Sequence, residues 1–275
     1  MNELILHHYP QSPFAEKARL MLGFKGLTWR SVMIPAVMPK PDLTALTGGY
    51  RRAPVMQVGA DIYCDTAMIA RRLEQEKVAP ALIPEGREAA AVGLAQFADQ
   101  VLFQHAVAIN FQPKGLAARF AALLSRLETQ LQRDGDFLLG DAPCIADFAH
   151  YHALWFVGSN AAVADALAGY PAVNSWMQRM ADIGHGVASE LSAEEAVRIA
   201  KEATPAELPS NPITSPGSFA LGQAVTVSAV DYGADEVAGT LVFEGAEEII
   251  IAREDDRVGL VHVHFPRYGY AIKAA

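Results

Sequence analysis

Short hydrophobic runs and helical stretches alternate along the first third of the chain. The β-branched and aromatic runs have the composition of strands, and apolar residues at helical spacing lie between and after them. The pattern predicts strands at 4–8, 29–34, 54–58 and 61–64, and helices at 14–24 and from 65 onward. This order, β-α-β followed by β-β-α, predicts a small α/β domain over residues 1–77.

The middle of the chain has a different pattern. From Arg87 to about Lys201 the sequence is rich in Ala and Leu at helical spacing, and no strand alternation competes with it. The apolar positions Phe120, Leu123, Leu124, Leu127 and Leu131 are one example. We therefore predict an all-α second domain at 87–202.

A third region follows a change in composition. Pro, Ser, Thr and Asn are frequent at 203–217, as is typical of a linker. Beyond it, short alternating runs separated by Gly and Asp predict strands at 224–230, 240–243, 249–251 and 258–265. They fit a small SH3-like or OB-like β-barrel at 218–275. We expect this barrel to be an independent unit that docks on the helical domain through residues such as Phe265, Tyr268 or Tyr270.

The composition excludes some classes of binding partner. The chain has 275 residues, of which 51% are hydrophobic, and this supports a large core. Its net charge of −9 argues against nucleic acid or an anionic membrane as the main partner. No segment approaches the ~20 apolar residues of a membrane span. No signal peptide pattern is evident either, so the expected location is the cytoplasm. Cys64 and Cys144 suggest neither a disulfide nor a zinc site. His262 and His264 share a strand face without an evident third ligand, so no metal is predicted.

Two positions have the chemistry of a peptide-binding site. Pro at the head of a strand is compatible with a cis peptide bond, and a cis Ala53-Pro54 bond would turn the N–H and C=O of Ala53 outward, toward an extended peptide. After the next strand, Asp65 and Thr66 start a helix whose first turn offers free N–H groups to an anion. A peptide-binding backbone and a carboxylate-binding helix end are therefore expected side by side.

These motifs resemble the glutathione-binding half of the glutathione transferase family. Ser12-Pro13-Phe14-Ala15 stands where members place Ser, Cys or a Cys-Pro-Phe-Cys-like motif, Pro54 stands at the cis-proline, and Asp65-Thr66 stands at the Glu/Asp-Ser pair. The resemblance implies a thioredoxin-like first domain and a helical second domain. Ala53 departs from the usual Val or Ile, and the segment 48–52 replaces the usual Asn-Pro-x-Gly-Lys.

The resemblance also implies a role for each matching residue. Ser12 is the predicted catalytic residue, whose hydroxyl would donate a hydrogen bond to the glutathione thiolate at a helix N-terminus. Taken without the resemblance, Ser12 before Pro13 is an ordinary helix cap. Tyr9 is the alternative hydroxyl. The γ-glutamyl carboxylate of glutathione is assigned to Thr66, and its ammonium to Asp65.

The remaining contacts are assigned in the same way. Ala53 and Pro54 would hold the peptide backbone of glutathione. Arg52 is a candidate for its glycine carboxylate, together with Arg51 and Lys40. Residues 140–147 resemble the family's buried capping box, in which Asp147 accepts a hydrogen bond from the Cys144 N–H although Cys144 replaces the usual Ser or Thr.

The sequence thus predicts a homodimeric glutathione transferase that activates the glutathione thiolate for attack on a small hydrophobic electrophile. The alternative is a non-catalytic, transferase-like binding or scaffold module with partner specificity from the C-terminal barrel. Because no glutathione motif lies beyond Thr66, a chain ending near Thr204 is expected to fold and to bind glutathione.

Overall fold

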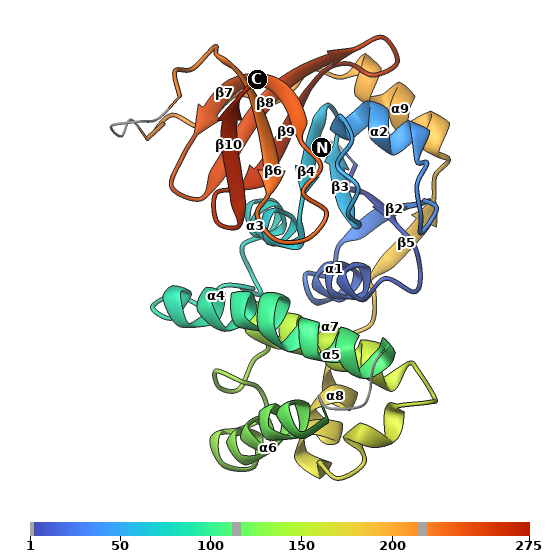
Figure 1. Ribbon diagram of the computed structural model, residues 1–275, viewed down its shortest axis with the longest axis vertical. Coiled ribbons are helices and arrows are strands. Elements are labelled where there is room, and N and C mark those ends of the chain that lie inside the picture. Colours follow the sequence, from blue (N-terminus) through green and yellow to red (C-terminus); the bar gives the residue numbers. More distant parts are fainter. Residues whose placement is uncertain (1–2, 112–116, 214–218) are drawn as a thin grey trace. The chain divides into compact units, whose positions relative to one another are not determined.

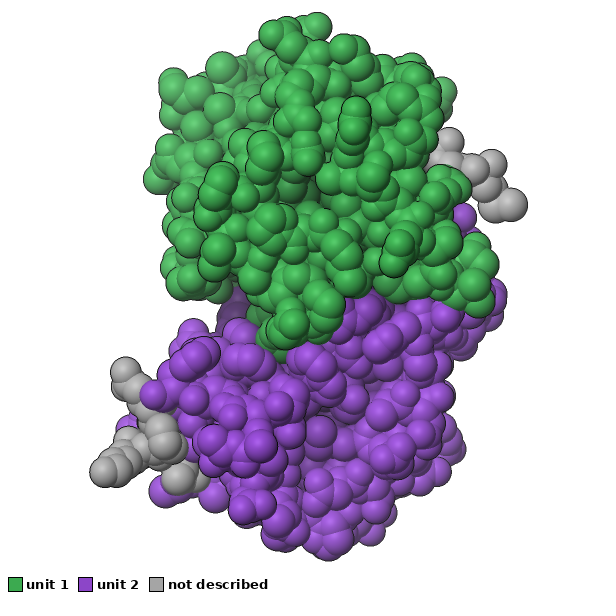
Figure 2. Space-filling view, turned by 90° about the vertical axis from the view of Figure 1, so that its right-hand side faces the viewer, with its two compact units in different colours: residues 1–15, 28–72, 187–275 green, residues 16–27, 73–186 purple. Residues whose placement is uncertain are grey.

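Two compact units make up the described chain. The computed structural model describes residues 3–111, 117–213 and 219–275. The first unit combines residues 1–15, 28–72 and 187–275, and the second combines residues 16–27 and 73–186 (Figure 2). The end of the predicted linker and the first residue of the predicted barrel, 214–218, lie outside the described residues.

One ten-stranded sheet runs through the first unit, in the order β10-β6-β7-β8-β9-β4-β3-β1-β2-β5 (Figure 1). Its strands are β1 Ile5–His8, β2 Thr28–Met33, β3 Val55–Val58, β4 Asp61–Cys64, β5 Val187–Glu190, β6 Ala224–Ala229, β7 Val237–Glu244, β8 Glu248–Asp255, β9 Gly259–Pro266 and β10 Tyr270–Ala274. The four strands predicted before residue 65 are confirmed to within a residue at each end. Together with the helices that follow, they form the predicted thioredoxin-like fold.

The helices of this unit begin where the sequence supplies start signals. They are α2 Pro41–Thr47 and α9 Ala193–Glu202, while α1 Pro13–Phe24 and α3 Thr66–Glu76 begin in the first unit. Pro stands at the first position of α2, and Gly48 ends α2 with a φ of 79°. The Ser192 hydroxyl caps α9 by accepting a hydrogen bond from Glu195 N (3.1 Å). Helix α9 packs against α2 (Figure 1).

The C-terminal β domain, strands β6–β10, continues the thioredoxin-like sheet. Strand β9 pairs in parallel with β4, placing Asp61 opposite His262 and Tyr63 opposite His264. A single hydrophobic core contains residues of both parts, among them Ile62 and Phe265. The expectation that this domain packs independently is wrong, because β4 offers an edge of unpaired backbone groups and β9 occupies that edge.

The structure also differs from two other expectations. Phe265 and Tyr270 pack beside Tyr50 inside the first unit, so the docking role on the helical domain expected for them is wrong. Tyr268, the third residue expected to dock, is 59% exposed.

The predicted run of helices to residue 202 is interrupted by β5, which pairs in parallel with β2. The four residues of β5 are all exposed and carry no alternation that would have revealed a strand.

A buried polar cluster joins β4 to β9. His264 lies between two carboxylates, with Nε2 3.0 Å from Asp61 Oδ1 and Nδ1 2.6 Å from Glu248 Oε1. Asp61 Oδ2 also accepts a hydrogen bond from Ala206 N (2.8 Å), which ties the start of the linker to the sheet. The Tyr63 ring stacks on His264 at 4.3 Å between centroids. Within the described ranges, no group of three or more His, Cys, Asp or Glu side chains is arranged to hold a metal ion.

The second unit is helical, as predicted. Its elements are α4 Glu88–Phe97, the π-helical turn η1 Ala98–Leu102, α5 Phe103–Phe111, α6 Ala117–Asp134, α7 Ile145–Gly158, the 3-10 turn η2 Ala164–Leu167 and α8 Pro171–Asp182. Asp147, fully buried in the first turn of α7, accepts hydrogen bonds from Cys144 N (3.0 Å), Leu138 N (2.9 Å) and Trp176 Nε1 (2.9 Å). The predicted hydrogen bond from Cys144 N to Asp147 is confirmed. None of the helices in the described ranges has the length and apolarity needed to cross a membrane.

Candidate functional site

Three neighbouring strands bring the predicted site residues to one end of the sheet. Strand β3 is antiparallel to both β1 and β4, with Val55 opposite His7 on one side and Cys64 on the other. The end of β1, the start of β3 and the end of β4 therefore lie together. Ser12 follows β1, Ala53-Pro54 precedes β3, and Asp65-Thr66 follows β4. Residues as far apart in the sequence as Ser12 and Thr66 thus lie together at this end of the three strands.

Ser12 caps α1 and keeps a donor hydrogen. Its Oγ accepts a hydrogen bond from Ala15 N at 3.1 Å, and its side chain is almost fully buried, with 2% exposed. A hydroxyl carries two acceptor lone pairs and one donor hydrogen, and the cap uses only an acceptor. In the part of the chain that the structure describes, the Ser12 hydroxyl donates to no acceptor, so the cap does not use its hydrogen.

The peptide bond between Ala53 and Pro54 is cis, as predicted. Lys40, predicted as a possible contact of the glycine carboxylate, donates from Nζ to Arg51 O at 3.2 Å and lies 5.9 Å from the centroid of the Tyr9 ring. Burial and the charge of Arg51 lower the pKa of the Lys40 ammonium. Tyr9 thus contributes the face of its ring to this cation, and its role as the alternative hydroxyl stays a prediction.

Asp65 is held in an unusual backbone conformation at the start of α3. Its φ of 78° is the only positive value among the non-glycine residues that the structure describes. Asp tolerates this left-handed region better than most side chains, and such conformations concentrate at functional sites. Asp65 Oδ1 accepts a hydrogen bond from Ala67 N at 3.0 Å, and Thr66 beside it is 3% exposed. Asp65 therefore caps the helix, and this hydrogen bond holds its carboxylate in place.

Two tyrosines that the sequence did not assign to the site complete this arrangement. Tyr270, the first residue of β10, donates from its hydroxyl to Asp65 Oδ2 at 3.1 Å. The Tyr50 hydroxyl lies 2.9 Å from that of Tyr270. Burial, followed by the charge of Asp65, raises the pKa of both phenols well above the usual value, so both stay neutral. No local sequence signal announces this contact, because Tyr270 is 205 residues from Asp65.

The C-terminal β domain also contacts the predicted arginines. Arg52 Nη2 donates to Asp231 Oδ1 and to the backbone oxygen of Tyr232, both in the connection after β6. Arg51 lies 3.6 Å from an Asp235 carboxylate oxygen and over the ring of Tyr232. The role of Arg52 toward the glycine carboxylate stays a prediction, and any such ligand would meet a guanidinium that is already held in place.

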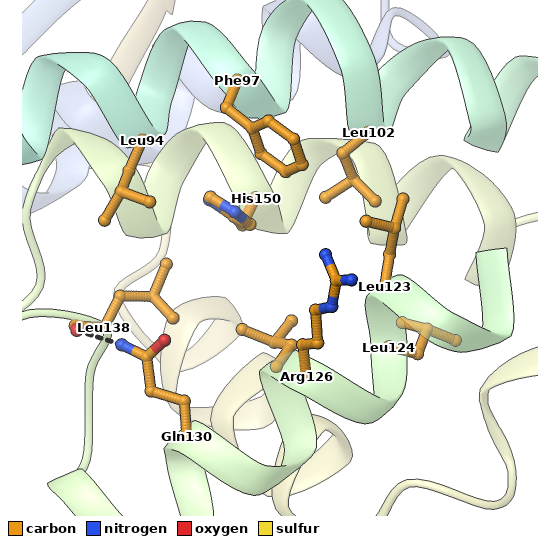
Figure 3. A pocket seen from close by; sticks show the side chains of 10 residues that line it. Leu94, Phe97, Leu102, Leu123, Leu124, Arg126, Gln130, Leu138 and His150 are labelled. Carbon is orange, nitrogen blue, oxygen red and sulfur yellow. Dashed lines mark hydrogen bonds between the residues drawn. The ribbon is translucent and has the colours of Figure 1, made fainter. Parts of the chain in front are cut away.

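A separate cavity lies inside the second unit, among α4, η1, α6 and α7 (Figure 3). It has a volume of about 260 Å³ and mostly apolar walls. Arg126 and His150 are its ionisable side chains, and Gln130 Nε2 donates to Leu138 O at 2.7 Å. Burial lowers the pKa of His150, which keeps the imidazole neutral near pH 7. None of the predicted site residues lines this cavity.

Comparison with known proteins shows the family of the chain. Residues 6–81 match the family described as "Glutathione S-transferase, N-terminal domain", and residues 113–183 match the family described as "Glutathione S-transferase, C-terminal domain". A crystal structure of a GST-like protein from Pseudomonas syringae is 56% identical, has a TM-score of 0.94, and aligns over 98% of this chain and 100% of its own. The chain belongs to the glutathione transferase family. Among proteins with curated descriptions, none matches it.

More distant solved structures share the fold over part of the chain. Rice GST1 (OsGSTU1), solved in complex with glutathione, is 20% identical with a TM-score of 0.57, and aligns over 70% of this chain and 94% of its own. FzlA from C. crescentus is 22% identical with a TM-score of 0.54, and aligns over 65% of this chain and 87% of its own. Most of each of these two structures aligns with about two thirds of this chain, whereas the P. syringae protein aligns with 98% of it.

Proposed function

We propose that the protein is a glutathione transferase that activates the glutathione thiolate for attack on a small hydrophobic electrophile. The observation that carries this proposal is the meeting of Ser12, the cis Ala53-Pro54 bond and Asp65-Thr66 at one end of three adjacent strands. Each offers a group that suits one part of a γ-glutamyl tripeptide. Bound glutathione would supply the nucleophilic sulfur.

The residues divide the work by their chemistry. Ser12 donates a hydrogen bond toward the sulfur at the start of α1, where the helix dipole and free N–H groups also favour the thiolate. A free thiol has a pKa of ~8.5. Ala53 pairs its backbone with that of the peptide. Thr66 and the first turn of α3 receive the γ-glutamyl carboxylate, and Asp65 faces the ammonium. Both cysteines are buried and free, which fits the reducing cytoplasm that we propose as the location.

Replacing Ser12 tests the catalytic assignment. In Ser12→Ala we expect glutathione affinity to change less than threefold while turnover falls roughly 10- to 100-fold, the equivalent of losing ~1.5–3 kcal/mol from a hydrogen bond to a charged group. The pKa of the bound thiol, followed by ultraviolet thiolate absorbance against pH, should rise. Calorimetry measures the affinity, and conjugation of a chromogenic electrophile measures turnover.

Ser192→Ala is the matched control for that experiment. Ser192 caps α9 with the same chemistry as Ser12 caps α1, so both variants lose ~1 kcal/mol of helix capping. Only Ser12→Ala should alter the thiol pKa. Equal behaviour of the two variants would reduce Ser12 to a cap. Wild-type protein that binds no glutathione would instead favour the alternative, a transferase-like scaffold.

We also propose that the protein is a homodimer, because its membership of the glutathione transferase family implies one. One chain has a mass of 29.6 kDa, and sedimentation equilibrium at micromolar concentration should give twice that mass. Glutathione should leave this mass unchanged. A single species at the monomer mass across the concentration range would contradict the proposal.

A further inference from the structure

The C-terminal β domain reaches the carboxylate proposed to recognise glutathione. Tyr270 is 5% exposed and contacts Asp65 through a hydrogen bond to Oδ2. Tyr270 also closes an aromatic cluster with Tyr50 and Phe265, whose ring centroids lie 6.5 Å and 5.6 Å from its own. Its hydroxyl is therefore fixed by a packed ring and does not swing freely.

The direction of the hydrogen bonds follows from the groups involved. An ionised carboxylate only accepts, so the Tyr270 hydroxyl spends its one hydrogen on Asp65. The Tyr50 hydroxyl must then donate to the Tyr270 oxygen across their 2.9 Å contact. The result is a one-way chain, Tyr50 to Tyr270 to Asp65, in which each bond polarises the next.

Both carboxylate oxygens of Asp65 are thereby oriented. Oδ1 accepts from Ala67 N and Oδ2 accepts from Tyr270. A carboxylate has about four acceptor positions, so each oxygen keeps one for a ligand. Two fixed bonds remove the rotational freedom that an unrestrained Asp side chain would lose on binding an ammonium.

We propose that Tyr270 is a positioning residue of the glutathione site, which holds the Asp65 carboxylate for the α-amino group of the γ-glutamyl moiety. The C-terminal β domain is then part of the binding site and sets its preference for ligands with a free α-amino group. This inference rests on the proposed function, because it concerns the same site.

Calorimetry with two ligands tests the inference without a turnover assay. The ligands are glutathione and its analogue without the α-amino group, glutaryl-Cys-Gly. Wild type should prefer glutathione. In Tyr270→Phe we expect glutathione affinity to fall about tenfold and the analogue's by less than twofold, so that the preference ratio falls about tenfold. Tyr268→Phe, an exposed change in the adjacent turn, is the matched control and should leave both affinities unchanged.

A second variant guards against a folding defect. Tyr50→Phe/Tyr270→Phe removes both hydroxyls but keeps both rings, so no buried donor loses its acceptor, and the preference ratio should fall as in the single variant. A ratio equal to the wild-type ratio in either folded variant overturns the inference while the proposed function stands. If wild type binds neither ligand, the proposed function itself fails.

Discussion

A chain that ends at Thr204 is expected to lose the fold of its first unit, in contrast to the expectation from the sequence alone, because the C-terminal strands share its core and its sheet. The truncation removes all five strands of the C-terminal β domain, so that β4 becomes an unpaired edge. Ile62, Leu46 and Tyr50 share one core with Val263 and Phe265 and lose that cover. Full exposure of a large apolar side chain costs ~1.5–3 kcal/mol. Three such losses are comparable to the ~5–15 kcal/mol that stabilises a whole domain.

Near-ultraviolet circular dichroism and sedimentation velocity measure this result. We expect the truncated chain to lose near-ultraviolet signal and to associate, while residues 73–186 keep their helical far-ultraviolet signal. As a control, a protease site inserted at the exposed Ser210 cuts the linker without removing strands. The two fragments should then elute together, because β9 remains paired with β4. A monodisperse truncated chain with wild-type glutathione affinity would contradict the expectation.

Replacing His264 is expected to cost roughly 3–5 kcal/mol of unfolding free energy at pH 6, the scale of a buried charge left without its partner. In His264→Phe, Asp61 and Glu248 lose the imidazolium between them while a ring remains to stack on Tyr63. Burial opposes the charge on His264, but the hydrogen bonds that the imidazolium donates to Asp61 and Glu248 outweigh burial and raise the pKa of His264 above the ordinary value.

The sign of the pH dependence follows from that shift. A histidine with a raised folded pKa stabilises fully below its unfolded value, ~6.5, and this contribution disappears as pH rises through the folded pKa. The difference in unfolding free energy between wild type and His264→Phe should therefore shrink from pH 6 upward, as measured by urea denaturation.

His262 on the same strand provides the opposite trend. Burial, followed by the neighbouring charge of His264, lowers its pKa despite the nearby Asp61, so protonation of His262 opposes folding as pH falls. The stability lost in His262→Phe should be smallest at acidic pH.

A pH-independent cost for His264→Phe would contradict the prediction for His264, because it would mean that this imidazole is neutral in the native protein.

Local signals predicted the residues of the candidate site. Pro before a β-branched run, Ser before Pro, and Asp-Thr at a helix start each depend on nearby residues, so the sequence placed Ser12, Pro54 and Asp65 on the elements where they lie. The side-by-side position of Pro54 and Asp65 was also expected from these patterns, and the place of Ser12 beside them followed from the resemblance to the family.

The contacts from the end of the chain could not be read in that way. Val261 and Val263 have the same alternation whether β9 closes a barrel or extends another sheet, since periodicity reports which face is buried and not which strand is the neighbour. Tyr270 looks like any aromatic at the start of a strand. Its hydroxyl reaches Asp65 because β9 of the same C-terminal β domain pairs with β4, the strand that precedes Asp65.

The parallel pairing of β4 with β9 has a consequence for the order of events during synthesis. His264 emerges 203 residues after its partner Asp61, which at ~5–20 residues per second is an interval of roughly 10–40 s. Residues 73–186 form most of the helical unit and are complete before β9 exists. On the ribosome, the helical middle of the chain can therefore fold first, while the thioredoxin-like part of the first unit, with its β4 edge unpaired, waits for the last strands to emerge.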